Sequence, residues 1–294
     1  DIRVIGMKNH SKKLPKWTIV RRIVQFAVLL LFLTPFLAEI EGENFFFGTL
    51  SSSEILGIML TDPFGALQII FASKTVHTVL LIGAVTIFAF YFLIRGRVFC
   101  GWVCPVNLIL EFCNRLRKLF KIKKRYDVKV NRYTKIWIAL IILALSFASS
   151  LPVYEMFNPI GTVMKGIIFA TGLGVWSFIA IVIAEVFFAT RIWCRSLCPI
   201  GGFYQVVGKA GNFHVKIDHD KCIHCNHCKQ VCLADSEILV PVVDQGAIYV
   251  TAGDCMLCGK CVDHCNDNAL RIVPKLALVA KKENDMKKVE EKSA

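Results

Sequence analysis

Eight of the thirteen cysteines lie in the last third of the chain, in two copies of the spacing Cys-x2-Cys-x2-Cys-x3-Cys. The copies consist of Cys222, Cys225, Cys228 and Cys232, and of Cys255, Cys258, Cys261 and Cys265. This spacing is typical of proteins with two 4Fe-4S clusters, because three neighbouring thiolates hold one cube and the fourth reaches the other. We therefore predict crossed ligand sets: Cys222, Cys225, Cys228 and Cys265 for one cluster, and Cys255, Cys258, Cys261 and Cys232 for the other.

Two other uses of these cysteines are open. A disulfide framework is one, but a domain in a reducing compartment does not keep it. A pair of four-cysteine zinc sites is the other, although such sites usually consist of two separated Cys-x2-Cys pairs. A cysteine triple that is repeated at this spacing is more specific than one pair, so the pattern favours the clusters.

Long apolar blocks make up much of the rest of the chain, which is 55% hydrophobic and only 19% charged. A free soluble ferredoxin is excluded by this composition. The blocks cover residues 23–38, 75–94, 136–153 and 173–190. A bilayer core needs about 20 helical residues to cross it. We predict a membrane α-helical protein with four transmembrane helices, followed by a small α+β ferredoxin domain that holds two clusters.

The formal net charge of +13 is unevenly distributed. Seven Lys or Arg residues precede the first block and twelve lie within residues 95–135, whereas the segments after the first and third blocks have very few. This is the positive-inside pattern of a membrane protein rather than a nucleic-acid-binding surface. We expect a multi-pass protein of the bacterial inner membrane, with both termini and the cysteine-rich domain in the cytoplasm.

The apolar part is built from an internal repeat. The turn Asp62-Pro-Phe-Gly returns as Asn158-Pro-Ile-Gly, and Cys100-x3-Cys104-Pro returns as Cys194-x3-Cys198-Pro. We predict two tandem halves, about 17–125 and 134–210, in a membrane domain of residues 1–210. Each turn should lie outside and lead into a short external or re-entrant apolar helix. The ferredoxin domain should cover 211–274 and a polar tail 275–294.

Four further thiols should converge if the halves are symmetric: Cys100, Cys104, Cys194 and Cys198. We refer to residues 100–105 and 194–199 as the twin motifs. One hypothesis is a third iron–sulfur centre that bridges the two halves. The alternative is that each twin motif is a helix-terminating turn in which proline stops or redirects the chain and the cysteines only pack.

Taken together, the four apolar blocks, the twin motifs and the paired cluster motifs resemble the NapH-type membrane subunit of quinol dehydrogenases, over residues 17–272. The resemblance implies oxidation of membrane quinol, with electrons passed through a periplasmic NapG-type iron–sulfur protein toward a downstream cytochrome and periplasmic nitrate reductase. One departure is visible: Leu233 and Asn266 follow the fourth cysteines, where bacterial ferredoxins usually have proline. This departure affects loop geometry and leaves the ligands in place.

Quinol oxidation also needs a proton acceptor near the electron acceptor. Glu185 is the only carboxylate well inside an apolar block, and Tyr91 is its counterpart in the first half. His77 is a further candidate and is the only histidine in any block, which excludes a haem held by two histidines there. The alternative is that Glu185 is a structural residue neutralised by Arg191 or Arg95.

A second class of function is open at this stage. Related membrane polyferredoxins act as assembly or maturation factors that reduce the cofactor of another metalloenzyme. The absence of an additional soluble domain or a large flavin domain from this sequence favours the quinol dehydrogenase.

Overall fold

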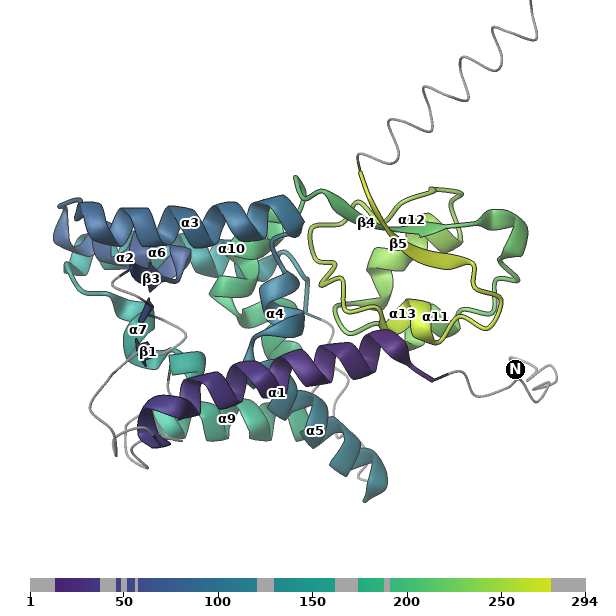
Figure 1. Ribbon diagram of the computed structural model, residues 1–294, viewed down its shortest axis with the longest axis horizontal. Helices are drawn as coiled ribbons and strands as arrows, with labels where there is room; N and C mark the ends of the chain where they lie inside the picture. The colour runs from purple at the N-terminus through teal and green to yellow at the C-terminus, as the bar shows by residue number, and fades with distance from the viewer. Residues whose placement is uncertain are drawn as a thin grey trace, which may run out of the picture.

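The computed structural model describes residues 14–37, 46–48, 52–55, 58–120, 130–161, 174–187 and 191–275. Its elements form a helical part that contains both repeats and a small α+β part at one end of the long axis (Figure 1). Most of the predicted polar tail and the apolar segment after the second turn, 162–173, lie outside the described residues.

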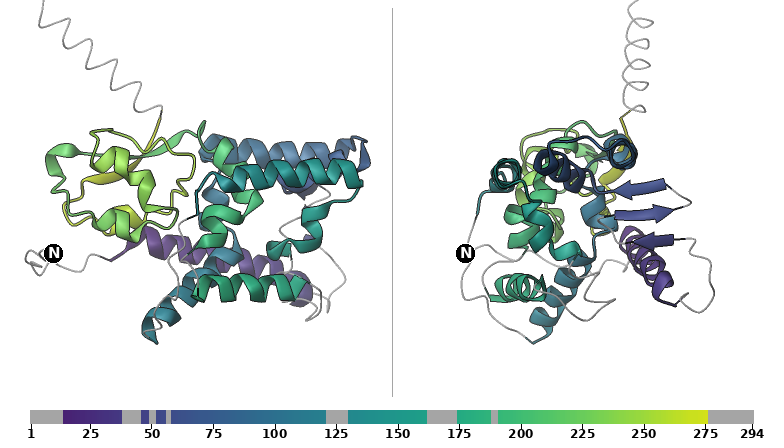
Figure 2. Two further views of the ribbon diagram at one scale, coloured as in Figure 1. Left: turned by 180° about the vertical axis from the view of Figure 1, so that it is seen from behind. Right: turned by 90° about the vertical axis from the view of Figure 1, so that its left-hand side faces the viewer.

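The helical part has two groups of helices. Helices α2, α3, α6 and α10 pack together, while α1, α5 and α9 form the other side (Figure 1, Figure 2). The helices are α1 (Lys16–Leu37), α2 (Pro63–Ser73), α3 (Thr78–Ile94), α4 (Val98–Trp102), α5 (Pro105–Leu119), α6 (Thr134–Ser149), α7 (Val153–Phe157), α9 (Gly174–Phe187) and α10 (Pro199–Val207). A π-helical turn, η1 (Trp193–Leu197), precedes α10.

Proline begins several of these helices. The Asp62 side chain caps α2 by accepting a hydrogen bond from Gly65 N at 3.0 Å, and Pro63 takes the first helical position. Pro105 and Pro199 likewise begin α5 and α10. Proline suits this position because the first helical N–H has no partner within the helix. Each twin-motif proline therefore starts a helix directly after the preceding helical segment, α4 or η1, has ended, as expected of a turn that redirects the chain.

Three short strands precede α2. They are β1 (Phe46–Gly48), β2 (Ser52–Ile55) and β3 (Ile58–Thr61), and they form an antiparallel sheet in the order β1-β2-β3. Thr61 ends β3 next to the capping residue of α2, so the sheet leads the chain from α1 into the first repeat turn.

Helices α1, α3, α6 and α9 lie on the four apolar blocks and have 22, 17, 16 and 14 residues. By length and composition, none of the helices in the described ranges could cross a membrane alone. Helix α6 and the segment Val153–Gly161 meet the requirement only as a pair, with a bend of 108° between them.

The α+β part is held by the antiparallel pair β4 (Phe213–Ile217) and β5 (Leu270–Pro274), with Val215 opposite Ile272. Between them lie α11 (His227–Val231), α12 (Val240–Val243), α13 (Lys260–Asp263) and the 3-10 turns η2 (His219–Lys221) and η3 (Ser236–Leu239). The core of this part is formed by Val215, Ile217, Leu239, Val242 and Leu270, each at most 2% exposed. The sheet thus brings both ends of the cysteine-rich segment together.

Candidate functional site

A small cavity in the α+β part is lined by four thiols. Cys222, Cys225 and Cys228 come from the first cluster motif, and Cys265 comes from the second. The walls also include the apolar side chains of Ile217, Ile223, Val243 and Leu270. A cavity among four thiols fits an iron–sulfur cube. Its composition supports the crossed ligand set predicted for the first cluster.

The four thiols predicted to hold the second cluster also lie close together. Cys232 interacts electrostatically with Cys258 and Cys255, and Cys261 interacts with these three thiols as well as with Cys228. Burial raises the pKa of Cys232 to about 12 and raises the pKa values of Cys255 and Cys261. Thiols in this environment are protonated until iron binds, so assembly of the cluster releases their protons.

No cysteine is in a disulfide, and all thirteen lie in the described residues. Across those residues, no three His, Cys, Asp or Glu side chains are gathered around a point that could hold a single metal ion. An iron–sulfur cube distributes its thiolates over separate irons. The evidence for a cluster site is therefore the cavity lined by Cys222, Cys225, Cys228 and Cys265.

The two cluster motifs share a backbone conformation that their spacing did not predict. His224 and Asn226 have left-handed φ values of 52° and 58°, and their counterparts Leu257 and Gly259 have values of 46° and 69°. Each pair stands at the same positions after the first cysteine of its motif. A chain that alternates in this way curves around a centre and turns its N–H groups inward, a geometry that favours bound anionic groups.

The four twin-motif thiols converge in the helical part, and all are buried. Cys104 interacts electrostatically with the other three, and Cys198 also accepts a hydrogen bond from Gly201 N at 3.4 Å. Burial raises the pKa values of Cys194 and Cys198 to about 12 and about 11. Two thiols from each half therefore meet in an enclosed site that suits either neutral thiols or a metal centre.

The first twin motif touches the second cluster motif directly. A Cβ atom on Gly101 would lie 3.0 Å from the Met256 carbonyl oxygen and 3.8 Å from Cys258 Cβ. Trp102 Nε1 also donates a hydrogen bond to the Leu257 carbonyl oxygen at 3.1 Å. The glycine allows the backbones to approach closely. It brings the twin-motif thiols next to the second cluster motif.

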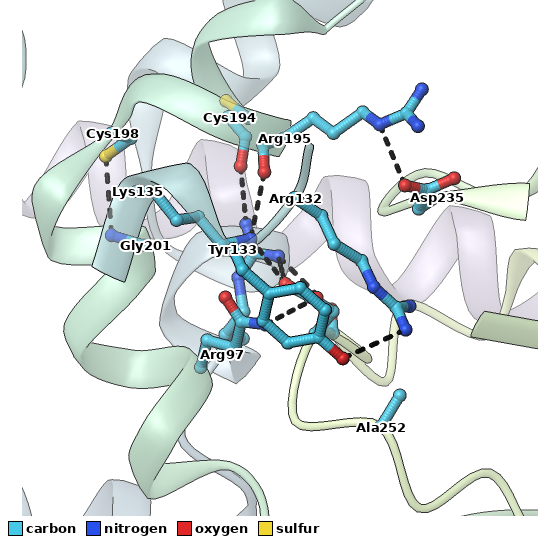
Figure 3. Close-up of polar contacts among 12 residues, drawn as sticks. Arg97, Arg132, Tyr133, Lys135, Cys194, Arg195, Cys198, Gly201, Asp235 and Ala252 are labelled. Carbon is cyan, nitrogen blue, oxygen red and sulfur yellow. Dashed lines mark hydrogen bonds and ion pairs between the residues drawn. The ribbon is translucent and has the colours of Figure 1, made fainter. Parts of the chain in front are cut away.

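Asp254 joins the two parts of the molecule. Its carboxylate pairs with Arg97 at 2.7 Å and with Lys135, and it accepts a hydrogen bond from Gln205 at 2.8 Å. Arg97 and Lys135 also donate to the carbonyl oxygens of Cys194 and Arg195 (Figure 3). One buried carboxylate thus links α4, α6 and α10 to the loop that carries Cys255.

Arg95 forms a second link between the parts. Its guanidinium donates to the carbonyl oxygens of Phe213, Val250 and Ala252, each at 2.8 Å, and lies 2.7 Å from His214 Nδ1. His214 Nδ1 also lies 3.2 Å from the Val250 carbonyl oxygen, so which of the two contacts is a hydrogen bond depends on the tautomer of the ring. Burial and the Arg95 charge lower the pKa of His214. Arg95 is thus not the partner of Glu185.

Glu111 on α5 is surrounded by cations. Arg21 and Arg22 of α1 approach it at 3.0 and 2.9 Å, and Arg191 and Lys260 at 3.8 Å. Although burial acts in the opposite direction, these charges lower the pKa of Glu111. Sequence reasoning missed this cluster, because its members are far apart in the chain.

The three residues predicted to handle protons have different surroundings. The Tyr91 ring packs against Phe99 and Tyr204, with ring centroids 5.7 and 5.5 Å apart. Glu185 is buried and accepts a hydrogen bond from Arg191 N, and it also interacts electrostatically with the Arg191 guanidinium. His77 is exposed and precedes α3. Tyr91 and Glu185 both interact electrostatically with twin-motif thiols, Tyr91 with Cys100 and Cys104 and Glu185 with Cys194.

Comparison with known families shows two kinds of match. A 4Fe-4S binding domain matches residues 76–123 and again 170–218, and a 4Fe-4S dicluster domain matches residues 214–266. The first domain thus occurs once in each repeat, over one twin motif each time. No solved structure matches the chain.

Characterised relatives cover most of the chain. The methylamine utilization ferredoxin-type protein MauN of Methylorubrum extorquens is 36% identical over 87% of this chain and 88% of its own length. The ferredoxin-type protein NapH of Escherichia coli is 33% identical over 90% of this chain and 92% of its own length. The NapH-type resemblance is confirmed, and the chain belongs to the NapH and MauN family of ferredoxin-type iron–sulfur proteins.

Proposed function

We propose that this chain is a multi-pass protein of the bacterial inner membrane that oxidises quinol and passes the electrons through iron–sulfur clusters toward a periplasmic reductase. Nitrate reductase is the proposed terminal acceptor, and a NapG-type iron–sulfur protein is the proposed partner. Membership of the NapH and MauN family supports electron transfer as the general role.

The observation that carries this proposal is the contact between the twin motifs and the second cluster motif. Gly101 lies against Met256 and Cys258. Trp102 donates a hydrogen bond to the carbonyl oxygen of Leu257, between Cys255 and Cys258. A redox site in the helical part would therefore be next to a site in the α+β part. A ferredoxin domain that only stored clusters would not need so close a contact.

Exposed apolar faces on four helices support the membrane location. Large apolar side chains that are at least 40% exposed occur along each predicted span. They include Ile23, Phe26 and Leu30 of α1, Ile82, Val85, Phe90 and Leu93 of α3, Trp137, Leu140, Ile141 and Leu145 of α6, and Trp176 and Ile183 of α9. Soluble proteins rarely expose continuous apolar patches of this extent. A lipid environment would cover them.

The cysteines of the two cluster motifs would hold 4Fe-4S clusters, which accept and release electrons one at a time. Side chains and backbone groups of the chain would surround these clusters. Asp254, Arg97 and Lys135 fix the second motif against the helical part, and the backbone N–H of Leu257 is hydrogen-bonded to the Cys255 thiol. Hydrogen bonds and nearby charges of this kind tune reduction potentials.

The test of quinol oxidation uses the purified full-length protein in lipid nanodiscs without oxygen. We expect a reduced short-chain quinol to bleach the visible absorption of the clusters and to produce the electron paramagnetic resonance signal of reduced 4Fe-4S centres. Cys100→Ser combined with Cys198→Ser should slow this reduction while the eight cluster cysteines remain. Clusters that respond to dithionite but never to quinol would refute the proposal.

Chemical analysis tests whether the twin motifs hold a third centre. Two 4Fe-4S clusters correspond to about eight irons and eight sulfides per chain, and a third centre adds to both counts. We expect the higher counts, together with protection of the twin-motif thiols from alkylation. About eight irons with all four twin-motif thiols freely alkylated would show that these cysteines only pack.

The MauN relatives support a second candidate function. Their names assign them to methylamine utilization, so this chain could serve the assembly or electron supply of another metalloenzyme by reducing its cofactor. Reduction of the clusters by quinol distinguishes the two candidate functions. An assembly factor would show no cluster reduction by quinol, and a deletion strain given active terminal enzyme would keep normal turnover.

A further inference from the structure

Asp62, which begins α2 at the first repeat turn, lies within the helical part. Its Oδ2 accepts a hydrogen bond from Gly65 N at 3.0 Å, and Tyr204 Oη donates to its Oδ1 at 3.4 Å. Tyr204 has no exposed surface, whereas Asp62 is half-buried. Helix α2 buries one face within the helical part, where Phe64 and Gln68 are 0% exposed.

The second repeat turn meets the first. Asn158 accepts a hydrogen bond from Ile160 N at 3.0 Å and donates to Glu155 Oε1 at 3.4 Å. A Cβ atom on Gly65 would lie 3.1 Å from Glu155 Oε1 and 3.8 Å from Asp62 Oδ2. The two carboxylates therefore lie over the same glycine, and each comes from a different half of the repeat.

Unpartnered buried donors lie at this junction. Among the described residues, Tyr154 Oη and Gln68 Nε2 have no hydrogen-bond partner, although the two residues are only 4% and 0% exposed. The Tyr154 hydroxyl interacts electrostatically with the carboxylates of Asp62 and Glu155 and also with the Cys198 thiol. Buried polar groups are normally paired, so this hydroxyl can hydrogen-bond a ligand that reaches the junction.

An aromatic group separates this junction from the twin motifs. Tyr91, Phe99 and Tyr204 pack against one another with ring centroids 5.5 to 5.7 Å apart. Tyr91 and Tyr204 each interact electrostatically with both Asp62 and Cys100. The carboxylates are thus one side-chain layer away from the thiols.

We propose that Asp62, Tyr204 and Tyr154 form the site at which a membrane hydroquinone binds through its hydroxyl group. This inference rests on the proposed quinol oxidation and locates it. A hydroquinone fits because its hydroxyl can donate to Asp62 and accept from Tyr154, while its ring packs on aromatic side chains.

The proton balance assigns a role to each carboxylate. Oxidation of a hydroquinone to a quinone releases two electrons and two protons, and two iron–sulfur centres are the oxidants, each of which takes one electron. As one quinol O–H bond breaks, an O–H bond forms on Asp62. The second proton goes to Glu155. Glu185 takes no part in this site, because it lies on α9 near Cys194 and not at the junction of the two repeat turns.

The test is equilibrium binding of a fluorescent alkyl-hydroxyquinoline N-oxide, a non-reducing quinol analogue, to the full-length protein in nanodiscs. Asp62→Asn removes the charge but keeps the cap of α2, since Asn158 has the corresponding position in the second half. We expect this variant to bind the analogue at least about tenfold more weakly, because a hydrogen bond to a charged acceptor is lost. Tyr154→Phe should weaken binding as well.

Asp244→Asn is the control, as it neutralises an exposed carboxylate of the α+β part and should leave affinity unchanged. Circular dichroism and cluster absorption check that each variant is folded. Equal affinity of wild type and Asp62→Asn, with quinol still reducing the wild-type clusters, would overturn this site alone. A wild-type protein that neither binds the analogue nor is reduced by quinol would overturn the site and the proposed function together.

Discussion

Single residues decide how the α+β part is attached to the helical part. Asp254 is 2% exposed and faces Arg97 and Lys135, which are 1% and 0% exposed. A buried carboxylate is stable only while such partners compensate its charge. Sequence gave no indication of this role, because an aspartate before a cysteine motif usually faces solvent.

Asp254→Asn should therefore destabilise the native structure by about 3–5 kcal/mol, since it leaves two buried cations without their anion. Chemical unfolding in detergent, followed by loss of cluster absorption, measures the effect. Asp244→Asn is the control, because Asp244 is exposed and its pair with Lys229 should contribute at most about 1 kcal/mol. Similar losses of stability in both variants would contradict the assigned role.

At the scale of elements, the apolar blocks and the cap residues located the helices well. Helices α1, α3, α6 and α9 lie where block length and hydropathy predicted them. The short helix α2 was also predicted, but the sequence left open whether it is external or re-entrant. An apolar helix of 11 residues is compatible with both locations. The twin motifs are turns of the kind that the sequence allowed, since each proline follows the end of one helical segment and takes the first position of the next helix.

At the scale of the whole molecule, the two parts are joined through polar side chains from distant segments. His214 belongs to this interface, where it faces Arg95, with Lys275 and the backbone of Val250 and Gly211 nearby. The pKa of His214 is lower in the folded protein than in the unfolded chain, where it has the ordinary histidine value of about 6.5. Below this pH the unfolded chain therefore binds more protons than the folded protein. Stability should therefore decrease as the pH falls through this range.

His214→Gln keeps a neutral acceptor for Arg95 but cannot titrate. We expect its free energy of unfolding to depend less on pH than that of the wild type between about pH 5.5 and 7. Denaturant unfolding at several pH values measures this difference. His219→Gln, on the same part of the chain, should keep the wild-type pH dependence; equal slopes for wild type and His214→Gln would exclude the interface effect.

The sequence by itself determined the local features of this protein: the two cluster motifs, the repeat and the positions of the main helices. Each follows from spacing or periodicity between residues that are near in the chain. Only the tertiary structure decided which distant groups meet, such as Gly101 with Met256, Asp254 with Lys135, and Asp62 with Glu155. These contacts depend on how the two halves and the α+β part pack, and a single sequence carries no direct measure of distance between segments that are far apart in the chain.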